Sequence, residues 1–140
     1  GDTSHPIWIH PLIASVFDAA REVFGRAVPI TRGVCCTAYQ QVLIARYVEE
    51  ERLGVPHTLG RPGQISEHEY ACALDFDAGG PEENREFAVT IHKVDPDIRI
   101  YIVQYNFRWG HMGCGYLLPD PLPDGRRKPE SWKAGVGDYP

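Results

Sequence analysis

The chain has 140 residues, of which 43% are hydrophobic and 24% are charged, a composition typical of one globular domain with a single core. Its formal net charge of −5 argues against a general nucleic-acid-binding protein. No apolar run approaches the roughly 18–20 residues that cross a bilayer, so we expect no membrane span.

The N-terminal part predicts an arm followed by a helix. Residues 1–11 hold two prolines and Trp8, which indicates an extended arm lying on the domain. Residues 12–24 carry Leu12, Val16 and Ala20 at helical spacing, and a glycine follows as a stop signal.

The next segment predicts a strand, a helix and a loop. Residues 28–31 favour a short strand, and Thr37 is a candidate cap for a second helix that runs to about residue 53. Residues 55–64 contain prolines and glycines without periodicity, which is typical of a loop.

The second half predicts mainly strands. Residues 71–76 favour a short strand, and a helix is expected to begin at Pro81, because proline suits the first helical position. Alternating apolar residues predict a strand over 98–103, and 107–112 is expected to return as its neighbour, with 113–118 as a further candidate strand.

Together these elements predict an α+β domain over residues 1–140, with the arm at 1–11 and a Pro/Gly-rich C-terminal tail at 119–140. Because the last strands follow one another closely, we expect a small antiparallel meander with the helices packed on one face. Trp132 and Tyr139 are candidate anchors of the tail, and the sequence does not indicate an oligomeric state.

The four cysteines are few for a disulfide scaffold, and no Cys-x-x-Cys pair predicts a structural zinc site. Cys35 and Cys36 are adjacent, and a bridge from either to Cys72 or Cys114 stays open. Free buried cysteines are the simpler expectation.

The stretch around residues 66–75 carries the chemistry. Strand alternation places Ala73 and Asp75 on one face of the predicted strand, and His68 lies in the loop just before it. An imidazole and a carboxylate supply two of the three protein ligands of a catalytic zinc site. His111, from a later strand, is our candidate for the third ligand, so we predict a zinc site formed by His68, Asp75 and His111.

These residues resemble a known family, the D-Ala-D-Ala carboxypeptidase-type zinc peptidases, which share a fold with the hedgehog signalling domain. Ser66, His68, Ala73 and Asp75 match the family pattern Ser-x-His-x-x-Gly-x-Ala-x-Asp, with Ala71 where the family has glycine.

A second block matches in its Trp-x-His form through Trp109 and His111, and residues 30–36 are similar to a strand–loop segment of the family. The resemblance implies a zinc ion and hydrolysis of peptides, chiefly D-Ala-containing peptides of cell-wall peptidoglycan. It also implies an extracytoplasmic, cell-wall-associated or phage-encoded protein.

Two departures from the family concern the chemistry rather than the metal. Arg108 stands where many members carry the general-base glutamate, and an arginine cannot accept a proton at ordinary pH. Cys35 stands where the family has a substrate-holding arginine. Glu67 and Glu69 are close in sequence to the ligands, but neither is assigned as the base.

The remaining candidates are substrate contacts. We expect Ser66 to donate a hydrogen bond to substrate or to a ligand, Trp109 to form a pocket wall, and Arg32 to bind a substrate carboxylate. Solvent exposure remains open for Arg32 and Arg108.

The other histidines have no predicted function, and two alternative functions of the chain remain open. His5, His10, His57 and His92 are expected to be ordinary surface or core residues. A metal-binding recognition domain without catalysis is one alternative function, and a thiol-based protein using the Cys35-Cys36 pair is the other.

Overall fold

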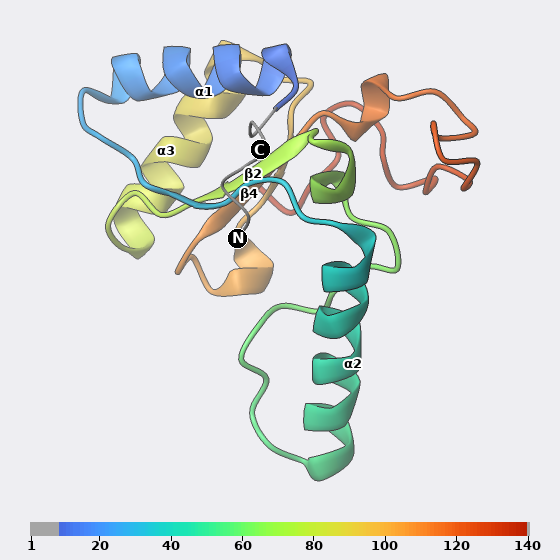
Figure 1. The fold of residues 1–140 in the computed structure, drawn as a ribbon. Helices are drawn as coiled ribbons and strands as arrows, with labels where there is room; N and C mark the ends of the chain where they lie inside the picture. Colours follow the sequence, from blue (N-terminus) through green and yellow to red (C-terminus); the bar gives the residue numbers. More distant parts are fainter. Residues whose placement is uncertain (1–8, 140) are drawn as a thin grey trace, which may run out of the picture.

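The computed structural model describes residues 9–139 and consists of an antiparallel sheet with two helices packed on one of its faces (Figure 1). The helices are α1 (Pro11–Phe24) and α3 (Pro81–Val94), which contact each other over the sheet. The predicted α+β class is therefore confirmed.

The sheet has four short strands in the spatial order β1-β2-β4-β3. The strands are β1 (Ile30–Arg32), β2 (Ala73–Phe76), β3 (Arg99–Tyr101) and β4 (Gly110–Gly113). All neighbouring pairs are antiparallel. The predicted pairing of the strand over 98–103 with the strand over 107–112 is confirmed, but the consecutive order of a meander is wrong, because β4 lies between β2 and β3.

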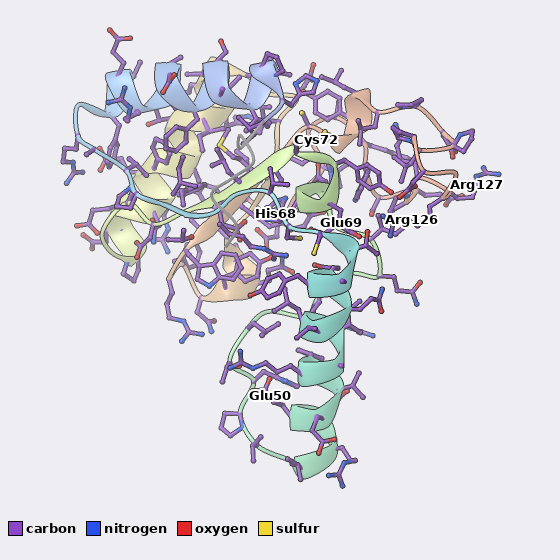
Figure 2. All side chains as sticks on the ribbon, viewed as in Figure 1. Glu50, His68, Glu69, Cys72, Arg126 and Arg127 are labelled. Carbon is purple, nitrogen blue, oxygen red and sulfur yellow. The ribbon has the colours of Figure 1, made fainter. Side chains whose placement is uncertain are left out.

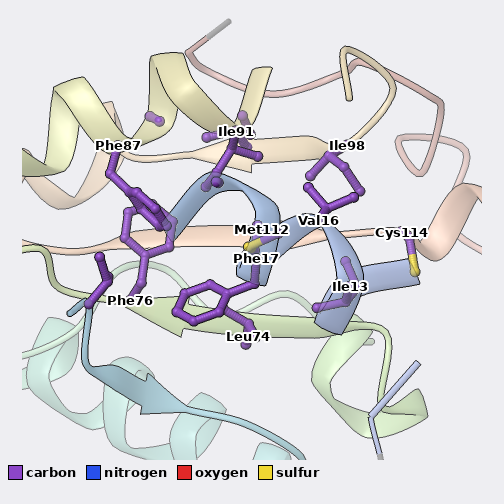
Figure 3. Packing of buried hydrophobic residues seen from close by; sticks show 14 of the residues in the cluster. Ile13, Val16, Phe17, Leu74, Phe76, Phe87, Ile91, Ile98, Met112 and Cys114 are labelled. Carbon is purple, nitrogen blue, oxygen red and sulfur yellow. The ribbon is translucent and has the colours of Figure 1, made fainter. Parts of the chain in front are cut away.

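Aliphatic and aromatic residues from the sheet and both helices form the core (Figure 3). Phe87 of α3 packs edge-on against Phe17 of α1 at 5.7 Å and against Phe76 of β2 at 5.0 Å between ring centroids. Such edge-to-face geometry is favoured by the ring quadrupoles. The core therefore occupies one face of the sheet and leaves the other face for polar residues.

Local sequence signals explain where these two helices begin and end. Pro11 and Pro81 open the helices, and the side chain of His10 accepts a hydrogen bond from the first turn of α1. Gly25 ends α1 in the left-handed conformation, with φ of 79°, which glycine adopts without strain.

The long helix α2 (Thr37–Leu53) does not pack on the sheet with the other two, contrary to the expectation (Figure 1). Gln40 is its one buried residue, while Val42, Val48 and Leu53 are exposed. Because its apolar residues do not gather on one side, the helix has no face to bury. It projects away from the sheet.

The segment after α2 runs back beside that helix as a return arm, residues 54–65 (Figure 1). Thr58 donates to the carboxylate of Glu50, and the rings of Tyr47 and His57 stack at 3.7 Å. The cap of α2 is Cys36 rather than the predicted Thr37, since the Cys36 sulfur accepts from the Tyr39 amide.

The C-terminal part holds no helix or strand over residues 119–139. Trp132 is buried and Tyr139 packs partly buried against the core, as expected for anchors. The candidate strand at 113–118 is wrong, because residues Gly115–Leu117 form a short 3-10 turn, η3. Within residues 9–139 no helix has the length and apolar character needed to cross a membrane. The predicted arm over residues 1–11 falls mostly on residues 1–8, which lie outside the described part, and Pro11 already belongs to α1.

Candidate metal centre

The pairing of β2 with β4 sets two of the predicted ligands opposite each other. In this register Asp75 faces His111 and Leu74 faces Met112. Leu74 and Met112 belong to the buried core, so the alternation of side chains sends Asp75 and His111 to the other face.

The third predicted ligand comes from the 3-10 turn Glu67–Tyr70, η1, just before β2. The Ser66 hydroxyl accepts from the His68 amide at 3.2 Å, and the Glu69 carboxylate accepts from the Ser66 amide at 2.7 Å. This reciprocal capping box fixes the turn that carries His68. Ser66 therefore has a structural role here, and Ala71 closes the turn at φ of 57°.

Three ligand atoms converge on one point of the polar face. His68 Nε2 and His111 Nδ1 each lie 3.0 Å from Asp75 Oδ1, and the two nitrogens are 3.2 Å apart. Donors 2.0–2.1 Å from a tetrahedral ion would be separated by roughly 3.3 Å, close to these values. His68, Asp75 and His111 could therefore hold a metal ion.

Each imidazole is oriented through its other nitrogen. His68 Nδ1 donates to the carbonyl of Gly33 at 2.6 Å, and His111 Nε2 donates to Glu67 Oε1 at 3.0 Å. Such outer contacts select the tautomer that leaves the facing nitrogen available to a metal. Both ligands are therefore oriented by groups outside the triad.

Glu67 is the centre of a buried network behind His111. Its carboxylate also accepts from the Arg99 guanidinium and, at 2.6 Å, from the amide of Gly115. Arg99 in turn donates to the Tyr101 hydroxyl at 2.9 Å. The buried negative charge of Glu67 thus has a buried positive partner, as interior charges require.

Burial and pairing act in opposite directions on these groups. Burial alone would raise the pKa of Asp75 and of Glu67, but hydrogen bonds from the imidazoles lower both below their ordinary values. Burial lowers the pKa of His68, whereas the two carboxylates overcome burial at His111 and raise its pKa to about 9. Metal binding to these groups is therefore linked to the release of protons.

The triad lies at the base of a cleft of about 980 Å³ formed between the sheet, α2, the return arm and the C-terminal segment. Ser66, Arg32, Arg108 and Trp109, the other predicted site residues, all line this cleft. The Trp109 ring stacks on Tyr105 at 3.4 Å, so it forms a wall, as expected.

Arg32 is half-buried rather than solvated. It donates to Gln40 Oε1 and to Cys35 Sγ, both at 3.1 Å, while its buried Nε has no hydrogen-bond partner among residues 9–139. Arg108 is exposed and has no ion pair with any of residues 9–139.

The carboxylates that line the cleft are all engaged elsewhere. Glu67 and Asp75 hold the imidazoles, and Asp77 accepts from the Gly79 amide and from Asn84. Glu69 does not line the cleft, and it is bound to Ser66 and to Arg126, which lies beside it in Figure 2. Within the described chain, no lining carboxylate is thus left free to act as a base.

Sequence reasoning missed the roles of Glu67, Arg99 and Tyr101, although signals for them existed. The capping-box pattern of residues 66–69 indicates a turn that would aim Glu67 and His68 to different sides. Alternation against the buried Ile100 of β3 places Arg99 and Tyr101 on the same face as His111.

The other histidines of the described chain stay outside the triad, and His5 lies outside the described residues. His10 caps α1, and His57 stacks on Tyr47. His92 is half-buried on α3.

All four cysteines are free. Cys72 and Cys114 are fully buried and meet across the ends of β2 and β4, where the Cys114 amide donates to the Cys72 carbonyl. Burial raises the pKa of the Cys35 thiol, which disfavours a reactive thiolate there.

Searches against protein-family models, curated proteins and solved structures find no match for this chain. The triad, its surroundings and the resemblance of its motifs are therefore the features that indicate a function.

Proposed function

We propose that this chain is a zinc-dependent peptidase that hydrolyses peptidoglycan-type, D-Ala-containing peptides, and that its fold is of the hedgehog/D-Ala-D-Ala peptidase kind. The observation that carries the proposal is the convergence of His68 Nε2, Asp75 Oδ1 and His111 Nδ1 within 3.0–3.2 Å of one another. The Ser66-to-Asp75 motif, with its small residues, supports the same assignment.

The donor set favours zinc over other common metals. Two imidazoles and one carboxylate are ligands that zinc accepts at catalytic sites, where three protein ligands leave a position open. Calcium and magnesium prefer sites built from oxygen atoms alone. The position of the triad at the base of an open cleft provides access for a substrate.

When bound, zinc lowers the pKa of a water molecule towards ~7 and polarises the carbonyl to be cleaved. The chain's own residues hold the triad and shape the cleft. Glu67 fixes the orientation of the His111 ring, and Gly33 fixes that of the His68 ring. Trp109 and Tyr105 form a flat apolar wall against which a peptide can lie.

A second candidate is a metal-binding domain that recognises peptides without cleaving them. Two observations favour it: Arg108 stands at the position of the family's base, and every carboxylate that lines the cleft is already bonded. Both candidate functions use the zinc site, and they differ in whether the bound peptide is hydrolysed.

The test is metal analysis of the purified protein, followed by assays with D-Ala-D-Ala peptides and purified peptidoglycan. The peptidase proposal expects one zinc per chain and cleavage that stops with a chelator and returns with zinc. Stoichiometric zinc without turnover on any of these substrates would favour the recognition domain. Absence of zinc binding would reject both candidates.

A further inference from the structure

Positive charge is concentrated in the metal cleft. Seven of the chain's 14 Lys and Arg residues line it, but only three of its 19 Asp and Glu residues do. Those three carboxylates are Glu67, Asp75 and Asp77, each of which is already bonded within the fold. The cleft is therefore cationic in a chain whose net charge is negative.

Four of the seven cations have partners inside the protein. Arg99 pairs with Glu67, and Arg127 pairs with Asp120 at 3.1 Å. Lys128 donates to two backbone carbonyls, and Arg32 donates to Gln40. These groups build the cleft and leave three arginines to be explained.

The three others are Arg46, Arg61 and Arg108, which are exposed and make no ion pair with any part of the described chain. They come from α2, the return arm and the turn between β3 and β4, so three separate segments bring them to one cleft. Arg61 and Arg108 also line an adjoining hollow of about 460 Å³, beside the stacked Tyr105 and Trp109. The cationic surface therefore continues outward from the metal site along the arm.

We propose that Arg46, Arg61 and Arg108 bind side-chain carboxylates of an acidic peptide, which is the substrate class of this cleft. The inference rests on the proposed function for the cleavage step, but the binding itself does not need the metal. Arginine suits this role because its planar guanidinium binds a carboxylate through two parallel hydrogen bonds.

An acidic peptide fits this surface better than a nucleic acid. Since the cleft has an excess of cations and the whole chain carries −5, the residues outside the cleft are more negative still. A long polyanion would extend beyond the cleft onto that repulsive surface, whereas a short peptide would remain inside it. The cations without an ion pair in the described chain are also limited to three arginines, of which Arg46 lies in the field of the Glu50 carboxylate, and they do not extend along a whole face.

The experiment measures binding of fluorescein-labelled hexaglutamate and hexaglutamine to chelator-treated, folded protein by fluorescence anisotropy. We expect hexaglutamate to bind at least about ten-fold more tightly, and the difference to shrink at high salt because exposed charges are screened. The triple variant R46Q/R61Q/R108Q should lose that preference. A matched control, R21Q/R52Q/K93Q, removes three exposed positive charges outside the cleft and should keep it.

Three results would overturn the inference: equal binding of the two peptides, equal weakening by the control triple, or tighter binding of a labelled hexathymidylate than of hexaglutamate. The last result would assign the surface to nucleic acid. Hydrolysis assays on the zinc-loaded protein are independent of this measurement. Failure of hydrolysis would therefore reject the peptidase proposal while leaving acidic-peptide binding intact. Failure of acidic-peptide binding would reject this inference while leaving the peptidase proposal intact.

Discussion

A single carboxylate, Glu67, connects the candidate metal ligands to the interior. It accepts from His111, Arg99 and the Gly115 amide at the same time, and it is almost fully buried. A buried ion pair of this kind contributes little net stability, because desolvation of the charges opposes their attraction. Its value in this fold is positional, since it fixes the ring of His111.

The substitution Glu67→Gln tests this positional role. The amide keeps the shape of the side chain but loses the charge, so we expect zinc affinity to fall by about 10–100-fold, as for other contacts behind metal ligands. Competition with a zinc indicator measures this. Glu69→Gln, in the same turn, is the matched control and should bind zinc as the native chain does, and an unchanged affinity in Glu67→Gln would refute the role.

The ligands themselves should act as a unit. We expect His68→Ala, Asp75→Ala and His111→Ala each to abolish stoichiometric zinc binding, because removing one donor leaves two. His57→Ala and His92→Ala should retain it, since neither side chain belongs to the triad. Metal content after dialysis is the measurement, and full occupancy in His111→Ala would show that the third ligand is another residue.

At residue scale the sequence could indicate the triad but not its support. Strand alternation alone puts Asp75 on the polar face, and the motif singles out His68. The approach of His111 depends on the β2–β4 register, which no local pattern specifies. The contact of Glu67 with Arg99 joins a turn to a distant strand, so only the folded chain reveals it.

At the scale of elements, the amphipathic helices α1 and α3 were predictable. For the long helix α2, the sequence predicted the length but not the position. α1 and α3 have apolar faces and clear caps, so both their presence and their packing follow from sequence. α2 ends at Gly54 as expected, but its scattered apolar residues gave no information on where it would lie. The pairing of β3 with β4 was predicted from their spacing and is confirmed, whereas the consecutive order of a meander is not found because β4 pairs with both β2 and β3.

The strand β4 also contributes through a residue that has no side chain. A Cβ at Gly113 would collide with the carboxylate of Glu67, whereas a Cβ at Gly33 would meet open space. We therefore expect Gly113→Ala to displace Glu67 and to cost about 1–3 kcal/mol of unfolding free energy, as overpacking does. Its zinc affinity should fall as well.

Urea unfolding and zinc titration measure both effects of Gly113→Ala. Gly33→Ala is the matched control, because Gly33 also lies beside a ligand but has room for a methyl group, and its effect should stay within about 0.5 kcal/mol. Equal stability of the two variants would mean that Glu67 adjusts without loss.

At the scale of the whole molecule, the chain consists of a packed body and a projecting arm. α1, α3 and the sheet form the body and hold the triad on its polar face (Figure 1). α2 and the return arm contribute little to the core but form one side of the cleft. The arm therefore lines the cleft without forming the core, and we expect substitutions at its exposed positions to leave the body folded.

Metal binding should stabilise the body as a whole. The triad joins η1 and β2, which follow each other in sequence, to β4, and 36 residues separate Asp75 from His111, so a bound ion would link segments that separate on unfolding. Zinc at 100 times its dissociation constant would add about 2.7 kcal/mol, provided that the unfolded chain does not bind it. For a domain of this size, that corresponds to a rise of roughly 10 °C in Tm. Differential scanning calorimetry with zinc and then with excess chelator measures the rise and its reversal. The His111→Ala variant should show no rise, and an equal rise in that variant would mean that zinc stabilises the chain at another site.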